Sequence, residues 1–416
     1  MREMKDSGIP WIGEIPKDWM AIKLLYVLRA RITDGPHETP VLVDDGIPFI
    51  SIDSLNDSDT IDLSNVRKFI SYDDYLRYNQ KSKIEKGDIL FTKAATIGKT
   101  AIVKDEVFMV WSPLAIIKAD YNIVDNRFLY HILNTDNLIK DVILHGSNNT
   151  QINVGMRELE AAIIPLPSLL EQQRIADFLD RKCAEVDEMI GLQEQIIEEL
   201  KAYKQSVITE AVTKGLNPDV PMKDSGIEWI DTIPHHWVVR KMKSLIDLKS
   251  GSNLTSEQIF DKDDGYPVYG GNGIRGTYSE YSNEGDYVLI GRQGALCGNI
   301  NYASGKFWVT EHALVCYPKE ALDIQWLGES LRAMNLNQYS LSAAQPGLSA
   351  ERIKNLYMIV PPLTEQQAIS DYLDEKCADI DSLIQTKQSK IDSLKEYKKS
   401  IIYEYVTGKM EVKGEL

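Results

Sequence analysis

Three short stretches of the chain combine glycines with side chains that can hydrogen-bond to bases and phosphates. They are residues 32–40, 266–275 and 291–294. Glycine lets a backbone approach a ligand closely, while Arg, Lys, Gln, Asn, His and Thr can contact base edges or phosphates. The residues that we expect to contact nucleic acid are Asp34, Gly35, His37, Thr39, Lys93, Lys99, Tyr269, Asn272, Arg275, Arg292 and Gln293. For Asp34, Gly35 and the glycines at 270–271, formation of a turn is the simpler role.

The sequence carries no motif that would make the chain an enzyme by itself. Gly98-Lys99-Thr100 is similar to the end of a phosphate-binding loop, but Lys93 stands where that loop needs its first glycine. The glycines at 270–273 lack the spacing of a dinucleotide site. The six histidines and four cysteines form no metal-ligand cluster, and no Asn-Pro-Pro-Tyr type motif of base methylation occurs. We predict no catalytic residue, no metal site and no cofactor bound by this chain.

The charge of the chain opposes a simple nucleic-acid binder. The net charge is −16, and residues 1–165, 166–215, 216–360 and 361–416 carry −5, −4, −4 and −3. Phosphate contacts usually require a basic surface. Any DNA-binding surface must therefore be a local patch on an acidic body, or be completed by a partner.

The location of the protein follows from two absences in the sequence. No apolar run reaches the roughly 18 residues that a membrane-spanning helix needs. The first residues lack the apolar core of a signal peptide. We expect a cytoplasmic protein that does not bind a membrane.

An internal repeat of about 200 residues organises the chain. Residues 4–12 recur as 222–230, and each copy leads to a second tryptophan, Trp19 or Trp237. Residues 171–213 align without gaps to 365–407, with about half the positions identical. The repeat is too long for a solenoid unit. It indicates a duplicated two-part half, which suits a target or partner that itself has two halves.

The second part of each repeat has the periodicity of a long helix. Prolines at 165–167 and 361–362 precede apolar residues spaced alternately by four and three, as in a coiled coil. The expected seam residues are Ile175, Leu179, Val186, Met189, Ile196, Leu200, Tyr203 and Val207, and Ile369, Leu373, Ile380, Leu383, Leu394, Tyr397 and Ile401. Polar residues interrupt it at Lys182, Lys376, Gln193 and Lys387. We expect an antiparallel pair roughly 65 Å long; two ordinary amphipathic core helices are the alternative.

The first part of each repeat has a mixed pattern. Alternating or apolar runs at 47–52, 87–92 and 286–290 predict strands separated by turn-rich loops. The expected fold is therefore α+β: two α/β modules and an antiparallel coiled coil of two long helices, with an internal pseudo-two-fold repeat. Module 1 covers residues 1–165 and module 2 covers 216–360, while the helical segments cover 166–215 and 361–416.

Together these residues resemble the specificity subunits of type I restriction–modification systems. The openings at 7–16 and its copy are similar to that family's module starts. The segments 167–175 and 362–369, each with Glu-Gln-Gln, are similar to the starts of its conserved helical regions. Residues 32–40, and 266–275 with Cys297-Gly298, resemble its target-recognition motifs. The likeness covers essentially the whole chain, and its repeated order is highly specific.

The resemblance implies a partner set and a division of labour. Each module would read one half of a split site in double-stranded DNA, and the paired helices would set the unread gap. Two methyltransferase subunits would dock on the helices, bind S-adenosylmethionine and methylate adenine. The restriction subunits would supply reactions that depend on ATP and Mg. We expect a gap between half a turn and one turn of DNA.

Two other functions compete with this interpretation. One is the specificity subunit of a related fused or two-component restriction system, which would share the architecture and differ in partners. The other is a structural adaptor whose modules bind proteins, which fits the acidic charge but leaves the paired polar loops unexplained. An enzyme acting alone is a third and weaker alternative.

Overall fold

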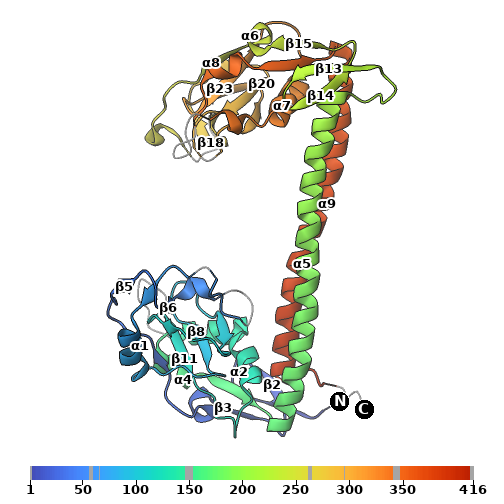
Figure 1. Ribbon diagram of the computed structural model, residues 1–416. Coiled ribbons are helices and arrows are strands. Elements are labelled where there is room, and N and C mark those ends of the chain that lie inside the picture. The colour runs from blue at the N-terminus through green and yellow to red at the C-terminus, as the bar shows by residue number, and fades with distance from the viewer. Residues whose placement is uncertain are drawn as a thin grey trace. The chain divides into compact units, whose positions relative to one another are not determined.

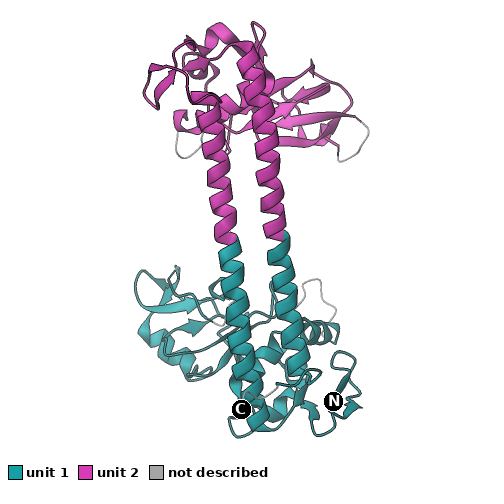
Figure 2. Ribbon diagram, turned by 90° about the vertical axis from the view of Figure 1, so that its right-hand side faces the viewer, with its two compact units in different colours: residues 1–193, 389–416 teal, residues 194–388 magenta. Residues whose placement is uncertain are grey.

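The computed structural model describes residues 2–55, 60–64, 66–145, 153–260, 265–294, 296–340 and 347–412, which fall into two compact units (Figure 2). Unit 1 comprises residues 1–193 and 389–416, and unit 2 comprises residues 194–388. The boundaries cut two long helices, α5 (Leu169–Lys214) and α9 (Leu363–Val406). Each unit therefore joins one module to one half of each helix.

Module 1 is built from four small sheets. Its central sheet has the order β4-β11-β8-β9, and a second four-stranded sheet has the order β10-β6-β7-β5. Two-stranded ladders β12-β3 and β1-β2 complete it. The strands are β1 (Met4–Asp6), β2 (Glu14–Pro16), β3 (Met20–Lys23), β4 (Thr33–Asp34), β5 (Leu42–Val43), β6 (Ile47–Ile50), β7 (Phe69–Ile70), β8 (Ile89–Thr92), β9 (Thr100–Ile102), β10 (Met109–Val110), β11 (Leu114–Ile117) and β12 (Ile163–Leu166). The helices are α1 (Tyr72–Asn79), α2 (Asn126–Leu133), α3 (Asp136–Leu144) and α4 (Met156–Ala161).

Module 2 repeats the central sheet and both ladders of module 1, and its second four-stranded sheet differs in the position of the fourth strand. The central sheet is β16-β23-β20-β21, the second is β18-β17-β22-β19, and the ladders are β15-β24 and β13-β14. The strands are β13 (Met222–Ile227), β14 (Ile230–Pro234), β15 (Val238–Lys241), β16 (Ile246–Ser250), β17 (Tyr266–Gly270), β18 (Gly273–Tyr278), β19 (Asn283–Glu284), β20 (Tyr287–Gly291), β21 (Ile300–Ala303), β22 (Lys306–Val309), β23 (Ala313–Pro318) and β24 (Tyr357–Val360). The helices are α6 (Met242–Leu245), α7 (Ile324–Ala333) and α8 (Ala350–Lys354).

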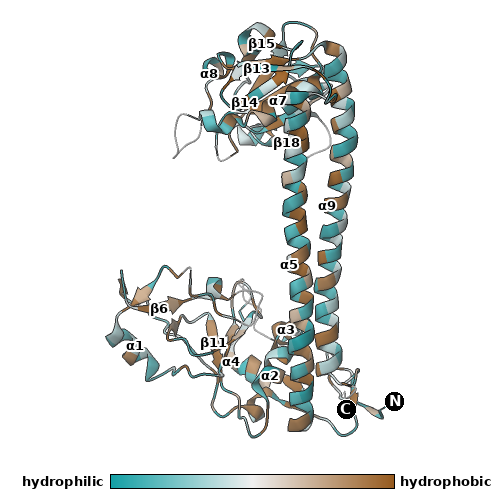
Figure 3. Ribbon diagram, turned by 45° about the vertical axis from the view of Figure 1, so that its right-hand side comes forward, coloured by the Kyte–Doolittle hydropathy of each residue, from teal (hydrophilic) through white to brown (hydrophobic). Residues whose placement is uncertain are grey.

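Continuous apolar runs account for the central strands, which Figure 1 labels in each module. All four residues of β8 and of β11 are buried, as are the last four of β20. Strands covered on both faces need such runs instead of alternation. Hydrophobic residues accordingly gather on β11 in Figure 3. The predicted strands at 47–52, 87–92 and 286–290 are confirmed, with boundaries shifted by one or two residues. The glycine-containing stretch at 266–275 forms a hairpin of β17 and β18.

The two long helices begin two residues after Pro167 and one residue after Pro362, as the proline positions predict. In unit 1 the first half of α5 packs with the end of α9, where Leu179 and Ile402 share a cluster. In unit 2 the end of α5 packs with the start of α9, where Ile208 and Leu373 share another. The predicted mixed fold with two modules and an antiparallel coiled coil is confirmed.

The expected helix seam coincides with buried or half-buried side chains at most of its positions. Ile175, Leu179, Val186, Ile369, Leu373 and Ile380 are buried, and Leu200 and Leu394 are half-buried. It is wrong at Met189, Tyr203, Leu383 and Tyr397, which are 41 to 58% exposed.

The next residue along the helix takes the seam position in each of these four cases: Ile190, Lys204, Ile384 and Lys398 are half-buried. Two of these replacements are lysines whose hydrocarbon stems can cover apolar surface. An ideal helix also drifts relative to a strict 3.5-residue repeat, which moves the buried stripe by one residue.

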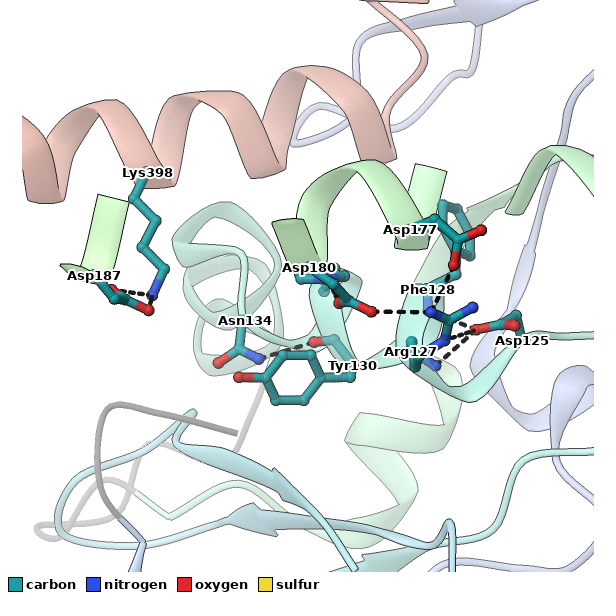
Figure 4. A network of polar contacts seen from close by, with 10 residues as sticks. Asp125, Arg127, Phe128, Tyr130, Asn134, Asp177, Asp180, Asp187 and Lys398 are labelled. Atoms are coloured by element: carbon teal, nitrogen blue, oxygen red, sulfur yellow. Dashed lines mark hydrogen bonds and ion pairs between the residues drawn. The ribbon is translucent and has the colours of Figure 1, made fainter. Parts of the chain in front are cut away.

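Two matching ion pairs join the helices. In unit 2, Lys204 Nζ lies 2.7 Å from both carboxylate oxygens of Asp381. In unit 1, Lys398 Nζ lies 2.7 Å from both oxygens of Asp187 (Figure 4). Both the lysines and the aspartates are related by the same offset as the sequence repeat. Polar pairs of this kind favour one register of the two helices.

The repeated Glu-Gln-Gln segment attaches each long helix to its module. Trp19 Nε1 donates to Glu171 Oε2 at 3.0 Å, and Trp237 Nε1 donates to Glu365 Oε2 at 2.9 Å. The following glutamine, Gln172, accepts from the Asp125 amide at 2.9 Å and donates to Pro167 O at 3.0 Å.

Gln366 makes the same two bonds to the Asp323 amide at 3.0 Å and to Pro361 O at 2.9 Å. The aspartates in turn cap α2 and α7. The repeated motif is therefore a structural joint between helix and module.

In unit 1 a further polar network strengthens this joint (Figure 4). Arg127 on α2 contacts Asp177 Oδ1 at 2.7 Å and Asp180 Oδ2 at 3.0 Å, both on α5. The buried His131 Nε2 lies 2.7 Å from Asp180 Oδ1. Burial raises the pKa of the Asp180 carboxyl, but the hydrogen bond and charge of His131 and Arg127 outweigh it, so this pKa lies below its ordinary value.

Candidate nucleic-acid interface

The loops that follow β8 and β20 occupy the same place in the two modules. The Lys93 amide donates to Pro113 O, and the Val154 amide donates to Lys93 O. In module 2 the Arg292 amide donates to His312 O, and the Leu348 amide donates to Arg292 O. Strand register agrees, because Thr92 and Gly291 each pair with the residue that begins the neighbouring strand, β11 or β23. Lys93 and Arg292 are therefore structural equivalents.

The same comparison aligns the strand ends beside these loops. Asp34 ends β4 and Ser250 ends β16, and each is followed by a glycine. A Cβ on Gly35 would lie 1.9 Å from Val110 O, and one on Gly251 would lie 2.2 Å from Val309 O. The glycine in each module is required by this close approach of two backbones.

In module 1 the predicted residues Asp34 and Lys93 bind each other. Lys93 Nζ lies 2.5 Å from Asp34 Oδ2, and the two side chains are 10% and 9% exposed. Asp34 belongs to a strand, and its carbonyl accepts from Ser82 Oγ at 2.6 Å. The turn expected for Asp34 is therefore wrong. The ion pair holds both side chains in the interior of module 1. Neither side chain is therefore exposed for a contact with DNA.

The other predicted residues of module 1 lie nearer the surface. His37 and Thr39 are exposed, and His37 Nε2 lies 3.3 Å from Asp34 Oδ2. Lys99 is half-buried, with its Nζ 3.5 Å from Leu55 O. These side chains combine with the Lys93–Asp34 pair at one end of the central sheet.

In module 2 the predicted Arg292 and Gln293 lie beside a histidine and a serine. Arg292 Nη1 donates to Ser250 Oγ at 3.2 Å, and Gln293 Oε1 lies 2.9 Å from His312 Nδ1. Gln293 is exposed and Arg292 is half-buried. The group therefore presents a guanidinium, an amide and an imidazole, which can donate and accept hydrogen bonds.

The β17–β18 hairpin adds a second set of residues to module 2. Asn272 is exposed at the turn and accepts from Asn299 Nδ2 at 2.9 Å. Arg275 is exposed, and its Cδ lies 2.6 Å from where a Cβ on Gly270 would be. Tyr269 is buried against Phe307, with ring centroids 5.6 Å apart, and burial raises the pKa of its phenol. Tyr269 is thus a core residue of this hairpin.

Sequence reasoning missed three members of this group: Ser250, His312 and Asn299. Asn299 is the equivalent of Lys99, because their carbonyls accept from the amides of Gly291 and Thr92 respectively. This equivalence could be found from the sequence only by aligning the two modules. The two modules differ too much in sequence around these residues for such an alignment. His312 lies at a turn between β22 and β23, and no feature of its neighbours in the sequence indicates its contact with Gln293.

The described residues contain no cluster of His, Cys, Asp and Glu side chains able to hold a metal ion. No helix in the described ranges has both the length and the hydropathy needed to cross a bilayer. The chemistry that these loops offer is hydrogen bonding and charge. In both modules this chemistry is concentrated at the loop that follows the third strand of the central sheet.

The structure thus has a duplicated α+β module, an antiparallel pair of long helices and one equivalent polar loop in each module. The family model described as the type I restriction modification DNA specificity domain matches residues 16–202 and again residues 234–409. The chain belongs to this family, and it is a specificity subunit concerned with DNA target recognition. The resemblance expected from the sequence is confirmed.

Individual relatives agree over almost the whole chain. The chain is 26% identical over 371 residues to the type I restriction enzyme EcoprrI specificity subunit of Escherichia coli, covering 86% of this chain and 87% of that protein. It is 26% identical over 430 residues to the putative MjaX specificity subunit of Methanocaldococcus jannaschii, covering 97% and 96%.

Solved structures show the same fold. A chain from a structure on assembly and conformational transition of the type I R-M system matches with a TM-score of 0.72 at 18% identity, covering 95% of this chain and 99% of that chain. The HsdS subunit from Thermoanaerobacter tengcongensis matches with a TM-score of 0.51 at 18% identity, covering 95% and 98%.

Proposed function

We propose that this chain reads a split site in double-stranded DNA, with one half read by each module, and that it has no catalytic activity of its own. The observation that carries this proposal is the structural equivalence of the loops after β8 and β20. Two readers with one backbone plan and different side chains can read two different half-sites. Base edges in the major groove carry the donor and acceptor pattern that such side chains distinguish.

The residues proposed to contact DNA are those that the structure leaves near the surface. In module 1 they are His37, Thr39 and Lys99, and in module 2 they are Asn272, Arg275, Arg292 and Gln293. Gly35 supports the loop by its close packing, while Asp34, Lys93 and Tyr269 act through the structure beneath it. The acidic body of the chain is consistent with a partner that supplies further positive surface.

We propose further that the long helices bind two methyltransferase subunits. Among the large apolar side chains exposed on the described helices, four are related by the repeat: Met189 with Leu383, and Tyr203 with Tyr397. Exposed apolar groups that recur in this way are typical of an interaction surface. Two equivalent surfaces suit two copies of one partner. S-adenosylmethionine would be bound by these subunits, and ATP and Mg by restriction subunits, in the cytoplasm of a prokaryotic cell.

The function is tested by methylation-sensitive long-read sequencing of the source genome with and without the gene. We expect deletion to remove N6-methyladenine from one motif that has two defined halves and a fixed gap. Survival of every methylated motif would contradict the proposal. Expression with the neighbouring methyltransferase in a host without DNA methylation then separates a silent system from an adaptor without DNA specificity.

The helix pair is proposed to set the gap between the halves. The interval from Asp187 to Lys204 in α5 equals the interval from Asp381 to Lys398 in α9, at 17 residues each. A four-residue insertion after Gln193 should therefore be matched by one after Gln388, so that both ion pairs keep their register. We expect this double insertion, about one helical turn, to lengthen the recognised gap without changing either half. An unchanged gap in an active complex would refute the ruler, and insertion into α5 alone is the control.

A further inference from the structure

Lys93 and Arg292 occupy one structural position, but their charges are used differently. The carboxylate of Asp34 neutralises Lys93 in module 1, at 2.5 Å and in the interior. In module 2 the residue equivalent to Asp34 is Ser250, whose hydroxyl accepts from Arg292 at 3.2 Å and carries no charge. Among the described residues, no carboxylate forms an ion pair with Arg292. The described residues therefore offer no carboxylate that balances the charge of this guanidinium.

The geometry around Arg292 leaves hydrogen-bonding capacity for a ligand. A guanidinium has five N–H donors in a planar fork, and the described residues engage it through the Ser250 hydroxyl. Its backbone is held on both sides, by the amide bond to His312 O at 2.8 Å and by the Leu348 amide at 2.9 Å. A cation on a fixed backbone with free donors is preorganised to bind a pair of acceptors.

The base that best matches such a fork is guanine. Its O6 and N7 atoms are two adjacent acceptors in the major groove, and bidentate contact from arginine is the commonest specific protein–DNA contact. A buried and paired lysine cannot make this contact. The neighbouring Gln293 and His312 are bonded to each other at 2.9 Å, which fixes the side of the loop next to the guanidinium.

We propose that Arg292 is a specificity-determining residue of module 2 that recognises a guanine, whereas the equivalent Lys93 of module 1 is a structural cation that reads no base. This inference rests on the proposed function of the modules as readers of DNA. The two modules would then differ in function at the equivalent position of Lys93 and Arg292. The half-site of module 2 then requires guanine where Arg292 binds, and module 1 depends on its other exposed residues.

The experiment is the methylated motif of the complex between the full chain and its methyltransferase, expressed in a host without DNA methylation. Arg292→Ala should relax one guanine position in one half of the motif and leave the other half unchanged. Arg292→Gln should shift that position towards adenine, since glutamine pairs with adenine. We expect discrimination at this position to fall by about tenfold to hundredfold.

The matched control is the double variant Lys93→Met with Asp34→Leu, which removes the equivalent cation without leaving a buried charge. We expect it to keep the module 2 half of the motif, including the guanine position, whereas the module 1 half also depends on His37, which contacts Asp34. A motif unchanged in R292A, or weakened equally at all positions, would overturn the proposal, because a phosphate contact carries no base preference.

If R292A abolishes methylation, Arg292→Gln decides. This variant removes the guanidinium but keeps a polar side chain, and glutamine matches adenine, so an unaltered guanine requirement would also overturn the proposal. A wild-type complex that methylates no split motif would refute the proposed function itself.

Discussion

Breaking the Lys93–Asp34 pair by Lys93→Met should destabilise module 1 strongly. The variant leaves the Asp34 carboxylate 9% exposed and without its lysine partner. Removing one member of a buried ion pair typically costs about 3–5 kcal/mol, because the remaining charge stays desolvated. His37 Nε2, 3.3 Å from the same carboxylate oxygen, favours the lower end of this range. We therefore expect a loss of about 3 kcal/mol.

Hydrogen exchange resolved along the chain measures this loss. A chain with two compact units does not unfold in one step, so a single unfolding free energy is not defined. Exchange instead reports the opening of each region separately. A loss of about 3 kcal/mol corresponds to exchange roughly a hundredfold faster in β4, β8 and β11. The strands β16, β20 and β23 of module 2 should be unaffected and serve as the internal reference.

The matched variant is Arg292→Met, at the equivalent position of module 2. Arg292 donates a hydrogen bond to the uncharged Ser250 hydroxyl near the surface. The loss of this hydrogen bond should cost about 1 kcal/mol or less of stability. The double variant Lys93→Met with Asp34→Leu should recover most of the stability, since apolar replacement of a buried pair is often neutral. If K93M accelerates exchange no more than R292M does, the buried pair does not stabilise module 1 as argued.

Three further predictions concern the helices and the thiols. Asp381→Lys should weaken the helix pair in unit 2, and the charge swap that adds Lys204→Asp should restore it. Because this ion pair is partly exposed, we expect a loss of stability of at most about 1 kcal/mol. Failure of the charge swap to restore stability would argue against direct pairing. The lowered pKa of Asp180 means that its carboxylate stabilises unit 1 above the ordinary value of 3.8, and that this contribution is lost as pH falls through the lower folded value. Asp180→Asn should therefore reduce stability at neutral pH and flatten its acid dependence, measured by exchange in α2; equal acid sensitivity in both proteins would refute this. Burial raises the pKa of the Cys316 thiol, so maleimide at neutral pH should label the half-buried Cys377 well before Cys316, and equal rates would contradict that packing.

The sequence was sufficient for the architecture because its strongest signals are local and repeated. The prolines at 165–167 and 361–362 predicted where α5 and α9 begin, and continuous apolar runs predicted β8 and β20. The seam was harder to predict because adjacent residues compete for it. Tyr203 and Lys204 illustrate this: hydropathy selects the tyrosine, while the structure buries the lysine stem and pairs its ammonium with Asp381.

The candidate site could be predicted only as a set of residue types. Lys93 and Arg292 were both chosen as polar residues after a strand, and the structure places them at equivalent positions. Their difference depends on Asp34 and Ser250, which lie 59 and 42 positions away in sequence. Tyr269 shows the opposite error, since an aromatic residue beside glycines was expected at the surface and lies in the core. Strand pairing brings together residues that are far apart in the chain, so their contacts cannot be predicted from neighbouring residues in the sequence.

The division of the chain into units has a consequence for the order of events on the ribosome. Unit 2 is one continuous stretch, so it can complete its core as soon as residue 388 has emerged. Unit 1 needs residues 389–416 as well, because Ile402 and Val406 pack in the cluster that holds Trp19. The Lys409 ammonium also binds Ile12 O at 2.6 Å. The half that is synthesised first is therefore finished last, and during synthesis its open core is the part of the nascent chain that most needs protection.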